Sequence, residues 1–168
     1  VVPEKAYETG PFTLQFYPVD HSIAQPTAVV LGCADGKILF TGDWKCESRD
    51  RSESATVDTV EKLSKEKFLA IYGDSTNAQV DGWSRSERDV AEAFAEVFDN
   101  CPGRIFITQF SSNMNRLQGI LQCSVEAKRP VVVMGRSLEQ NLLAAREEGV
   151  LPPDLTDRVS YDDGDLEG

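Results

Sequence analysis

The sequence predicts an α/β protein of two parts. Short apolar runs, some with period-two alternation, predict strands in the first part, as in residues 12–16. In the second part, segments with helical spacing alternate with short apolar runs, an order that implies a parallel sheet covered by helices. Because this change of rhythm follows Trp83, we expect one domain over residues 1–85 and another over residues 86–168.

A hairpin organises the first part. The pair Asp35-Gly36 is a strong turn signal between two apolar runs, and the strand before this hairpin leads the chain to His21. Val57, Val60 and Leu63 then recur at helical spacing. The expected elements are strands at 12–16, 28–31, 38–40 and 68–72, the last of them buried, and a helix at 57–65.

Three helices and two strands are expected in the second part. Ser84 followed by Glu87 is a capping box that predicts the start of a helix, and Pro102-Gly103 lies just beyond its end at Asn100. Gly149 and two prolines close the last helix. The expected elements are helices over 84–100, around Leu117, Ile120 and Leu121, and around Leu138, Leu142 and Leu143, with strands at 105–107 and 131–134.

Composition narrows the classes of function. With 17 Lys and Arg against 28 Asp and Glu the net charge is -11, which argues against a general polyanion binder, although six acids and one Arg lie within residues 154–168. Residue 1 is Val, and no apolar run approaches the ~20 residues of a membrane span, so we expect a cytoplasmic protein without a membrane partner. Cys33, Cys46, Cys101 and Cys123 form no C-x-x-C pair, which favours free buried thiols in a reducing compartment.

Two metal-ligand types flank the predicted hairpin. His21, the only histidine, precedes its first strand, and Asp43 follows its second. Imidazole nitrogen with carboxylate oxygen suits zinc or manganese better than calcium or copper. A structural histidine and an ordinary Thr-Gly-Asp turn are the alternative interpretation.

Other polar clusters follow the predicted strands, where ligands bind in open α/β sheets. Asp74 could be a general base, a metal neighbour or an orienting carboxylate, and Ser75 follows it. The junctions at 111–113 and 135–137 place hydroxyl and amide groups at helix starts, which favour anions. Plain N-capping is the alternative there. The candidate phosphate-binding residues are Ser75, Ser111, Asn113, Arg116, Arg136 and Ser137.

Six of these stretches together resemble the ribonuclease J family, and the resemblance covers nearly the whole chain. Their order and their spacing both agree with the family. The stretches are Val19-Asp20-His21-Ser22-Ile23, Phe40-Thr41-Gly42-Asp43-Trp44-Lys45, Gly73-Asp74-Ser75-Thr76-Asn77-Ala78, Ser86-Glu87, Phe110-Ser111-Ser112-Asn113 with Arg116, and Gly135-Arg136-Ser137-Leu138.

The resemblance implies part of a metallo-β-lactamase αββα fold followed by part of a β-CASP parallel-sheet α/β domain. It also implies RNA cleavage from the 5′ end and internally, with two zinc ions, or manganese or magnesium in their place. His21 and Asp43 resemble metal ligands, Asp43 bridging both metals, and Asp74 resembles a catalytic acid at the rim of the active site. The resemblance leaves a homo-oligomer open for the complete parent.

The family's H-x-H-x-D-H metal motif would precede residue 1, and its late histidines and 5′-phosphate loop would follow residue 168. The chain is therefore expected to be a central segment, inactive when isolated. A non-catalytic RNA-binding or scaffolding member of the same fold is the alternative, and an H-x-H-x-D-H run upstream would select the enzyme. An aspartate-based phosphohydrolase using Asp43 or Asp74 is disfavoured, because Asp74 has no second aspartate two residues on.

Overall fold

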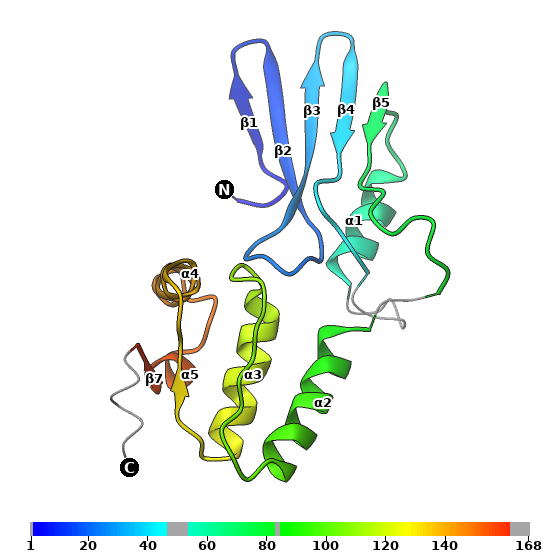
Figure 1. Ribbon diagram of the computed structural model, residues 1–168. Helices are drawn as coiled ribbons and strands as arrows, with labels where there is room; N and C mark the ends of the chain where they lie inside the picture. Colours follow the sequence, from blue (N-terminus) through cyan, green and yellow to red (C-terminus); the bar gives the residue numbers. More distant parts are fainter. Residues whose placement is uncertain (1, 47–53, 83–84, 162–168) are drawn as a thin grey trace. The chain divides into compact units, whose positions relative to one another are not determined.

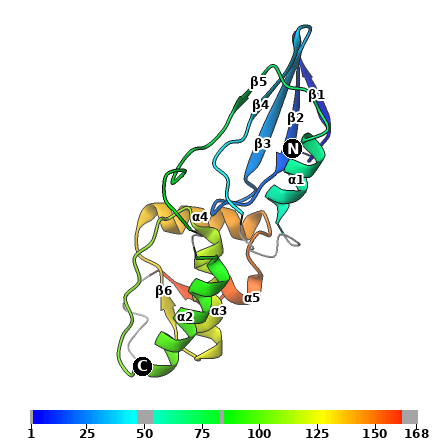
Figure 2. The same ribbon diagram turned by 90° about the vertical axis from the view of Figure 1, so that its right-hand side faces the viewer.

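A computed structural model describes residues 2–46, 54–82 and 85–161 (Figures 1 and 2). The chain forms two compact units, each with its own core. The first unit comprises Val1–His21 and Gln25–Ser84, and the second comprises Ser22–Ala24 and Arg85–Gly168. Trp83 and Ser84, which two of the predictions name, lie outside the described residues.

The first unit is a five-stranded sheet with one helix. The strands lie in the order β1-β2-β3-β4-β5, antiparallel except for the parallel pair β4 and β5. The predicted hairpin is confirmed, since Cys33 pairs with Gly36 across a two-residue loop. The elements are β1 (Ala6–Thr9), β2 (Phe12–Pro18), β3 (Thr27–Cys33), β4 (Gly36–Phe40), α1 (Ala55–Leu63) and β5 (Ala70–Tyr72).

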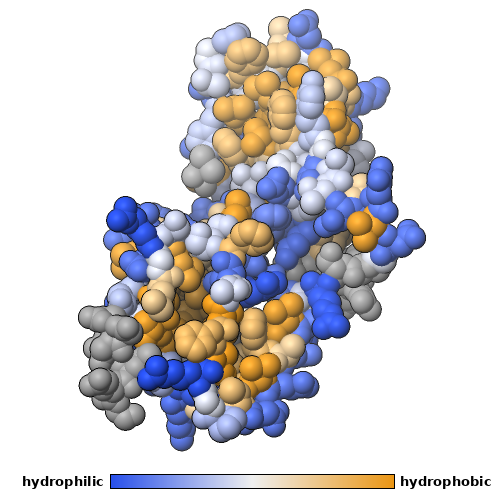
Figure 3. All heavy atoms as spheres, in the orientation of Figure 1, coloured by the Kyte–Doolittle hydropathy of each residue, from blue (hydrophilic) through white to orange (hydrophobic). Residues whose placement is uncertain are grey.

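The two faces of this sheet differ in burial. Tyr17, Val30 and Leu39 on one face are buried in a cluster with Leu63 of α1. On the other face the register aligns Phe16, Val29, Phe40 and Tyr72 in one row across four strands, and Phe40 stacks on Tyr72. Figure 3 shows apolar side chains gathered over these strands, and those of Phe12, Phe40 and Tyr72 are exposed.

The second unit is built from helices around a pair of short parallel strands. Its largest apolar cluster joins α3 and α4 with the strand pair and α5, and α2 packs on α3 through Phe98, Ile120 and Cys123. The elements are α2 (Glu87–Asn100), α3 (Met114–Glu126), β6 (Val131–Val132), α4 (Arg136–Glu147), α5 (Pro153–Thr156) and β7 (Val159–Ser160).

Several local predictions are corrected. No strand is assigned at 105–107, although Ile105 and Ile107 pack against the α2–α3 cluster, because no described strand pairs with this segment. Residues 68–72 were expected to be buried, but Ile71 and Tyr72 are exposed because β5 is the edge strand of the sheet. The prediction also missed β1, α5 and β7.

The capping of α2 differs from the predicted box. Ser86, not Ser84, caps this helix, and its side chain accepts from the Asp89 amide at 3.1 Å. The Asp89 carboxylate in turn accepts from the Ser86 amide at 3.0 Å. The box therefore lies two residues later than predicted, which leaves the Glu87 carboxylate for another contact.

All four cysteines are free, as predicted, but they are not all buried. Only Cys123 is buried, and burial raises the pKa of its thiol above the ordinary value. Cys46 is exposed, since it follows the strand-end segment on the surface. Across the described ranges, no helix has the length and apolar character needed to cross a membrane.

The adjacent leucines of α4 give a direct test of the core of the second unit. Leu142 is 1% exposed and Leu143 46% exposed. Leu142→Ala should lower the free energy of unfolding of the parent protein by about 2 to 5 kcal/mol, because it leaves a cavity in the largest cluster. Leu143→Ala should change it by no more than about 0.5 kcal/mol. Chemical denaturation checks both, and equal losses would contradict this packing.

Candidate functional site

Hydrogen bonds tie three segment ends of the first unit to one another. The segment Thr41–Lys45, which follows β4, bonds on one side to the end of β5 and on the other to Asp20 beyond β2. The Thr41 amide donates to the Tyr72 carbonyl at 3.0 Å, and the Thr41 hydroxyl accepts from the Asp74 amide at 2.9 Å. The Lys45 amide donates to the Asp20 carbonyl at 2.8 Å. These bonds bring the segments that carry His21, Asp43 and Asp74 to one edge of the sheet.

The start of helix α1 is hydrogen-bonded to the same strand-end region of the sheet. The Asp20 carboxylate accepts hydrogen bonds from the Ser54 hydroxyl and from the amides of Ala55 and Thr56, at 3.2 and 3.4 Å for the two amides. Ser54 is itself the N-cap of α1 and accepts from the Val57 amide. A carboxylate at a helix N-terminus is stabilised both by free N–H groups and by the helix dipole. The residue before His21 is therefore held rigidly.

Asp74 is ionised over a wider range of pH than an ordinary aspartate. The pKa of its carboxyl group is lowered chiefly by hydrogen bonds from the Thr76 side chain and amide, the latter at 2.8 Å. Smaller effects come from the backbone of Trp44 and the charge of His21, which oppose the effect of desolvation.

The donor set at this edge fits part of a zinc site. The imidazole of His21 and the carboxylate of Asp43 are ligand types that zinc accepts, with His21 half-buried and Asp43 exposed. Across the described part of the chain, however, no three His, Cys, Asp or Glu side chains form a metal-binding cluster. The described residues therefore do not by themselves form a complete zinc site, and the metal-binding roles of His21 and Asp43 stay predictions.

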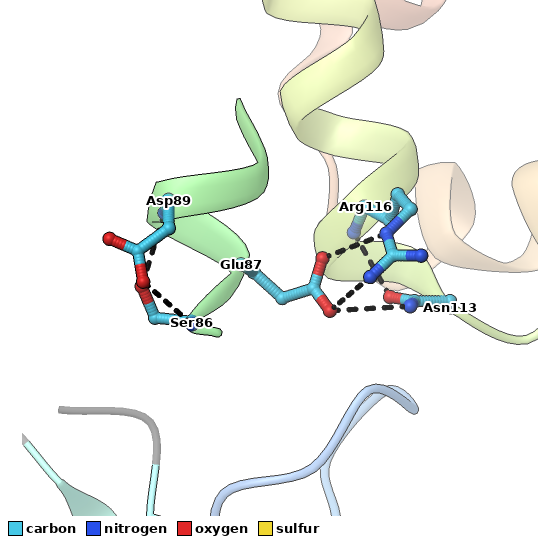
Figure 4. A network of polar contacts seen from close by, with 5 residues as sticks. All are labelled: Ser86, Glu87, Asp89, Asn113 and Arg116. Carbon is cyan, nitrogen blue, oxygen red and sulfur yellow. Dashed lines mark hydrogen bonds and ion pairs between the residues drawn. The ribbon is translucent and has the colours of Figure 1, made fainter. Parts of the chain in front are cut away.

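In the second unit, Arg116 is held by an ion pair that the sequence did not reveal (Figure 4). Its Nε and Nη2 donate to the two carboxylate oxygens of Glu87 at 3.1 and 3.0 Å. Asn113 caps α3 by accepting from the Arg116 amide at 3.0 Å, and its amide nitrogen lies 3.5 Å from the same Glu87 carboxylate. Glu87 therefore links the starts of α2 and α3.

The remaining candidate phosphate-binding residues lie in different settings. The Ser111 carbonyl accepts from Asn141 of α4 at 2.9 Å, which joins the 111–113 loop to that helix. Arg136 and Ser137 are exposed in the first turn of α4, whose N-cap Gly135 has φ of 112° and provides no side-chain cap. Ser75, in the first unit, is exposed in the turn closed by the Ala78 amide. Their RNA contacts stay predictions.

Sequence reasoning missed the residues that position the site. Thr56 and Thr59 are buried polar residues three apart on a helix, a spacing that places both on the face toward the sheet. That spacing was the available signal for Thr56. Sequence patterns assigned Asp20 and Glu87 no positioning role, although both lie in stretches that resemble the family and Glu87 was also part of the predicted capping box. No local pattern pairs Glu87 with Arg116, which lies 29 residues later.

Comparison with known proteins agrees with this architecture. Residues 102–163 match the family model described as the β-CASP domain of ribonuclease J. The chain is 35% identical over 157 residues to ribonuclease J of Sinorhizobium meliloti, an alignment that covers 90% of this chain and 28% of that protein. It is 31% identical over 139 residues to ribonuclease J 1 of Streptococcus pyogenes serotype M3, covering 83% of this chain and 25% of that protein. The chain thus spans little more than a quarter of these relatives.

A solved structure shares the fold over the whole chain. It is a protein of unknown function from Enterococcus faecalis V583, with a TM-score of 0.68 and 18% sequence identity. The match covers 100% of this chain and 42% of that one. The predicted α/β fold is therefore confirmed, and residues 102–163 match the β-CASP part of that prediction.

The Glu87–Arg116 pair should contribute measurably to the stability of the parent protein. Its side chains are 15% and 33% exposed, so solvent screens the pair less than a surface pair. A double-mutant cycle with Glu87→Gln and Arg116→Gln should give a coupling energy of about 1 to 3 kcal/mol. The exposed Arg88–Glu92 pair on α2 is the control and should give about 0.5 kcal/mol or less. Equal coupling in the two pairs would show that Arg116 is not fixed by Glu87.

Removing the Thr76 hydroxyl should shift the titration of Asp74. Thr76→Val should raise the pKa of Asp74 toward the ordinary aspartate value, because the largest cause of the lowering is lost. Because the pKa of Asp74 is lower in the folded state, ionised Asp74 adds to the free energy of unfolding at pH values above its unfolded-state pKa. This contribution is lost as the pH falls through the folded-state pKa. The variant should therefore show a weaker loss of stability on acidification. NMR titration of the Asp74 carboxyl carbon in the parent checks this, with Ser75→Ala as the control, and an unchanged pKa would contradict it.

Proposed function

The chain corresponds to a segment of the longer proteins of the ribonuclease J family. We propose that its parent protein is a metal-dependent ribonuclease that cleaves RNA phosphodiester bonds from the 5′ end and internally. The observation that carries the proposal is the hydrogen-bonded joining of three segment ends, which bear His21, Asp43 and Asp74. The matches to ribonuclease J support RNA decay or processing as its role. A cytoplasmic location accords with four free thiols.

His21 and Asp43 would hold zinc, two ions in the complete parent, with manganese or magnesium as alternatives. When bound, zinc activates a water molecule and stabilises negative charge that develops on a phosphate. Asp43 offers two oxygens and could serve both ions, whereas His21 offers one nitrogen. Asp74 is ionised and accepts a hydrogen bond from Thr76. At the rim of the site it would accept a proton as a general base or orient a neighbouring group.

The remaining candidate residues would position the RNA. Arg136 and Ser137 offer an exposed guanidinium and hydroxyl beside the amides of the α4 start. Arg116 uses Nε and Nη2 on Glu87, so Nη1 is the nitrogen that would meet a phosphate. Ser75, Ser111 and Asn113 would add neutral hydrogen bonds of the kind that fix the backbone register of a nucleic acid.

The isolated segment should be inactive. The described residues bring together no three metal-ligating side chains, whereas a catalytic zinc ion takes three protein ligands. The other ligands would have to come from further parts of the parent, as the greater length of the relatives permits.

Asp43→Ala in the parent should abolish RNA cleavage, a loss of at least about 100-fold, because a shared anionic ligand is removed. The control is Asp35→Ala, which removes an exposed carboxylate at the other end of the same strand and should leave cleavage unchanged. Single-turnover cleavage of a 5′-monophosphorylated RNA with added zinc or manganese checks both. Near-normal cleavage by Asp43→Ala would place the site elsewhere. Failure of the wild-type parent to cleave RNA, with RNA binding intact, would favour the scaffolding alternative.

A further inference from the structure

The hydroxyl of Thr56 closes a hydrogen-bonded ring between two segments of the first unit. Thr56 is 0% exposed. Its Oγ1 accepts from the Asp20 amide at 2.7 Å and donates to the Lys45 carbonyl at 2.7 Å. The Lys45 amide donates back to the Asp20 carbonyl at 2.8 Å, so one buried side chain and one backbone bridge join the same two residues.

Each of these residues lies within two residues of a predicted metal ligand. Asp20 immediately precedes His21, and Lys45 lies two residues after Asp43. Resting on the proposed function, we propose that Thr56 is a positioning residue that sets the relative placement of His21 and Asp43 for zinc. Thr56 does not touch the metal or the RNA, and it acts through the backbone of the two segments.

A hydroxyl is the group that this position requires. It can accept from one backbone amide and donate to one backbone carbonyl at the same time, which neither an apolar side chain nor a cation can do. An isosteric valine would remove the Thr56 partner from the part-buried Asp20 amide and Lys45 carbonyl, and the loss of such a partner is unfavourable. The two segments would then separate or turn until water or another group satisfied these atoms.

The competing interpretation is that the threonine hydroxyls of α1 only stabilise the fold. Thr59 is the control that tests this interpretation. Thr59 lies three residues later on α1, is 4% exposed, and donates to the Pro18 carbonyl at 2.6 Å. That contact joins α1 to a single strand and does not bridge to the Thr41–Lys45 segment. Thr59 therefore matches Thr56 in residue type, helix and burial, but it does not connect Asp20 with Lys45.

The experiment compares Thr56→Val, Thr56→Ser and Thr59→Val in the complete parent protein. Zinc affinity is measured by competition with a chromophoric chelator, and thermal unfolding of the metal-free protein reports stability. Hydrogen exchange is carried out on the metal-free protein and read out in the proteolytic peptides that cover residues 41–46. Thr56→Val should weaken zinc binding about tenfold or more, as loss of groups that orient metal ligands typically does. It should also speed amide exchange in those peptides.

The comparison variants decide between positioning and stability. Thr56→Ser keeps the hydroxyl and should restore both zinc affinity and exchange to near wild-type values. Thr59→Val should lower the unfolding temperature without either effect. Thr56→Ala serves where Thr56→Val does not fold, since it removes the hydroxyl without placing a methyl group against two polar atoms.

Two negative results have different meanings. If the wild type binds zinc but Thr56→Val and Thr59→Val weaken binding equally, or neither does, the role of Thr56 is refuted while the proposed function stands. If the wild-type parent binds no zinc and cleaves no RNA, the proposed function fails, and the metal role of Thr56 fails with it. Exchange at residues 41–46 still reports in that case whether the hydroxyl joins the two segments.

Discussion

The carboxylate of Asp20 is the constraint on which the candidate site depends. It accepts from a hydroxyl and two amides at the start of α1, so its charge is compensated by the N-terminus of that helix. The backbone of the same residue pairs with Lys45. One residue thus connects the helix, the end of β2 and the segment after β4, and His21 follows it directly. Movement of α1 would move both predicted metal ligands.

The register of the sheet supplies the second half of this arrangement. Because β4 and β5 run parallel, their carboxyl ends lie at the same edge, and Phe40 is aligned with Tyr72. Thr41 and Asp74 can then meet within two residues of the strand ends, at 2.9 Å. A shift of one residue would turn the stacked rings to opposite faces and separate these groups. The aromatic contact on the apolar face and the polar contact at the edge therefore depend on the same pairing.

Local sequence patterns predicted individual helices and turns better than they predicted strand pairing and side-chain exposure. The hairpin at Asp35-Gly36 and the helices around Leu117 and Leu142 were found because their turn chemistry and periodicity are written in consecutive residues. The segment at 105–107 is a short apolar run typical of a strand, but a strand also needs a partner, which sequence pattern alone does not provide. The exposure of Ile71 depends in the same way on its place in the sheet.

The candidate residues were predictable as types and positions, whereas their partners were not. Resemblance and strand-end placement selected His21, Asp43 and Asp74, but nothing local indicated that Thr56 would join two of their segments. Arg116 shows the same limit, since its partner Glu87 lies on another helix. Pairs of this kind follow from tertiary packing, which brings residues together regardless of their separation in sequence.

The ion pair of Arg116 also bears on how a protein of net charge -11 could bind RNA. Diffuse attraction to phosphate is unfavourable on such a surface, so affinity has to come from a few cations held in place. Glu87 reduces the net charge at Arg116, but it fixes the plane of the guanidinium through two hydrogen bonds and so lowers the entropy lost on binding a phosphate. If Arg116 meets a phosphate in the parent protein, as proposed, its contribution to binding should therefore come from geometry more than from net charge.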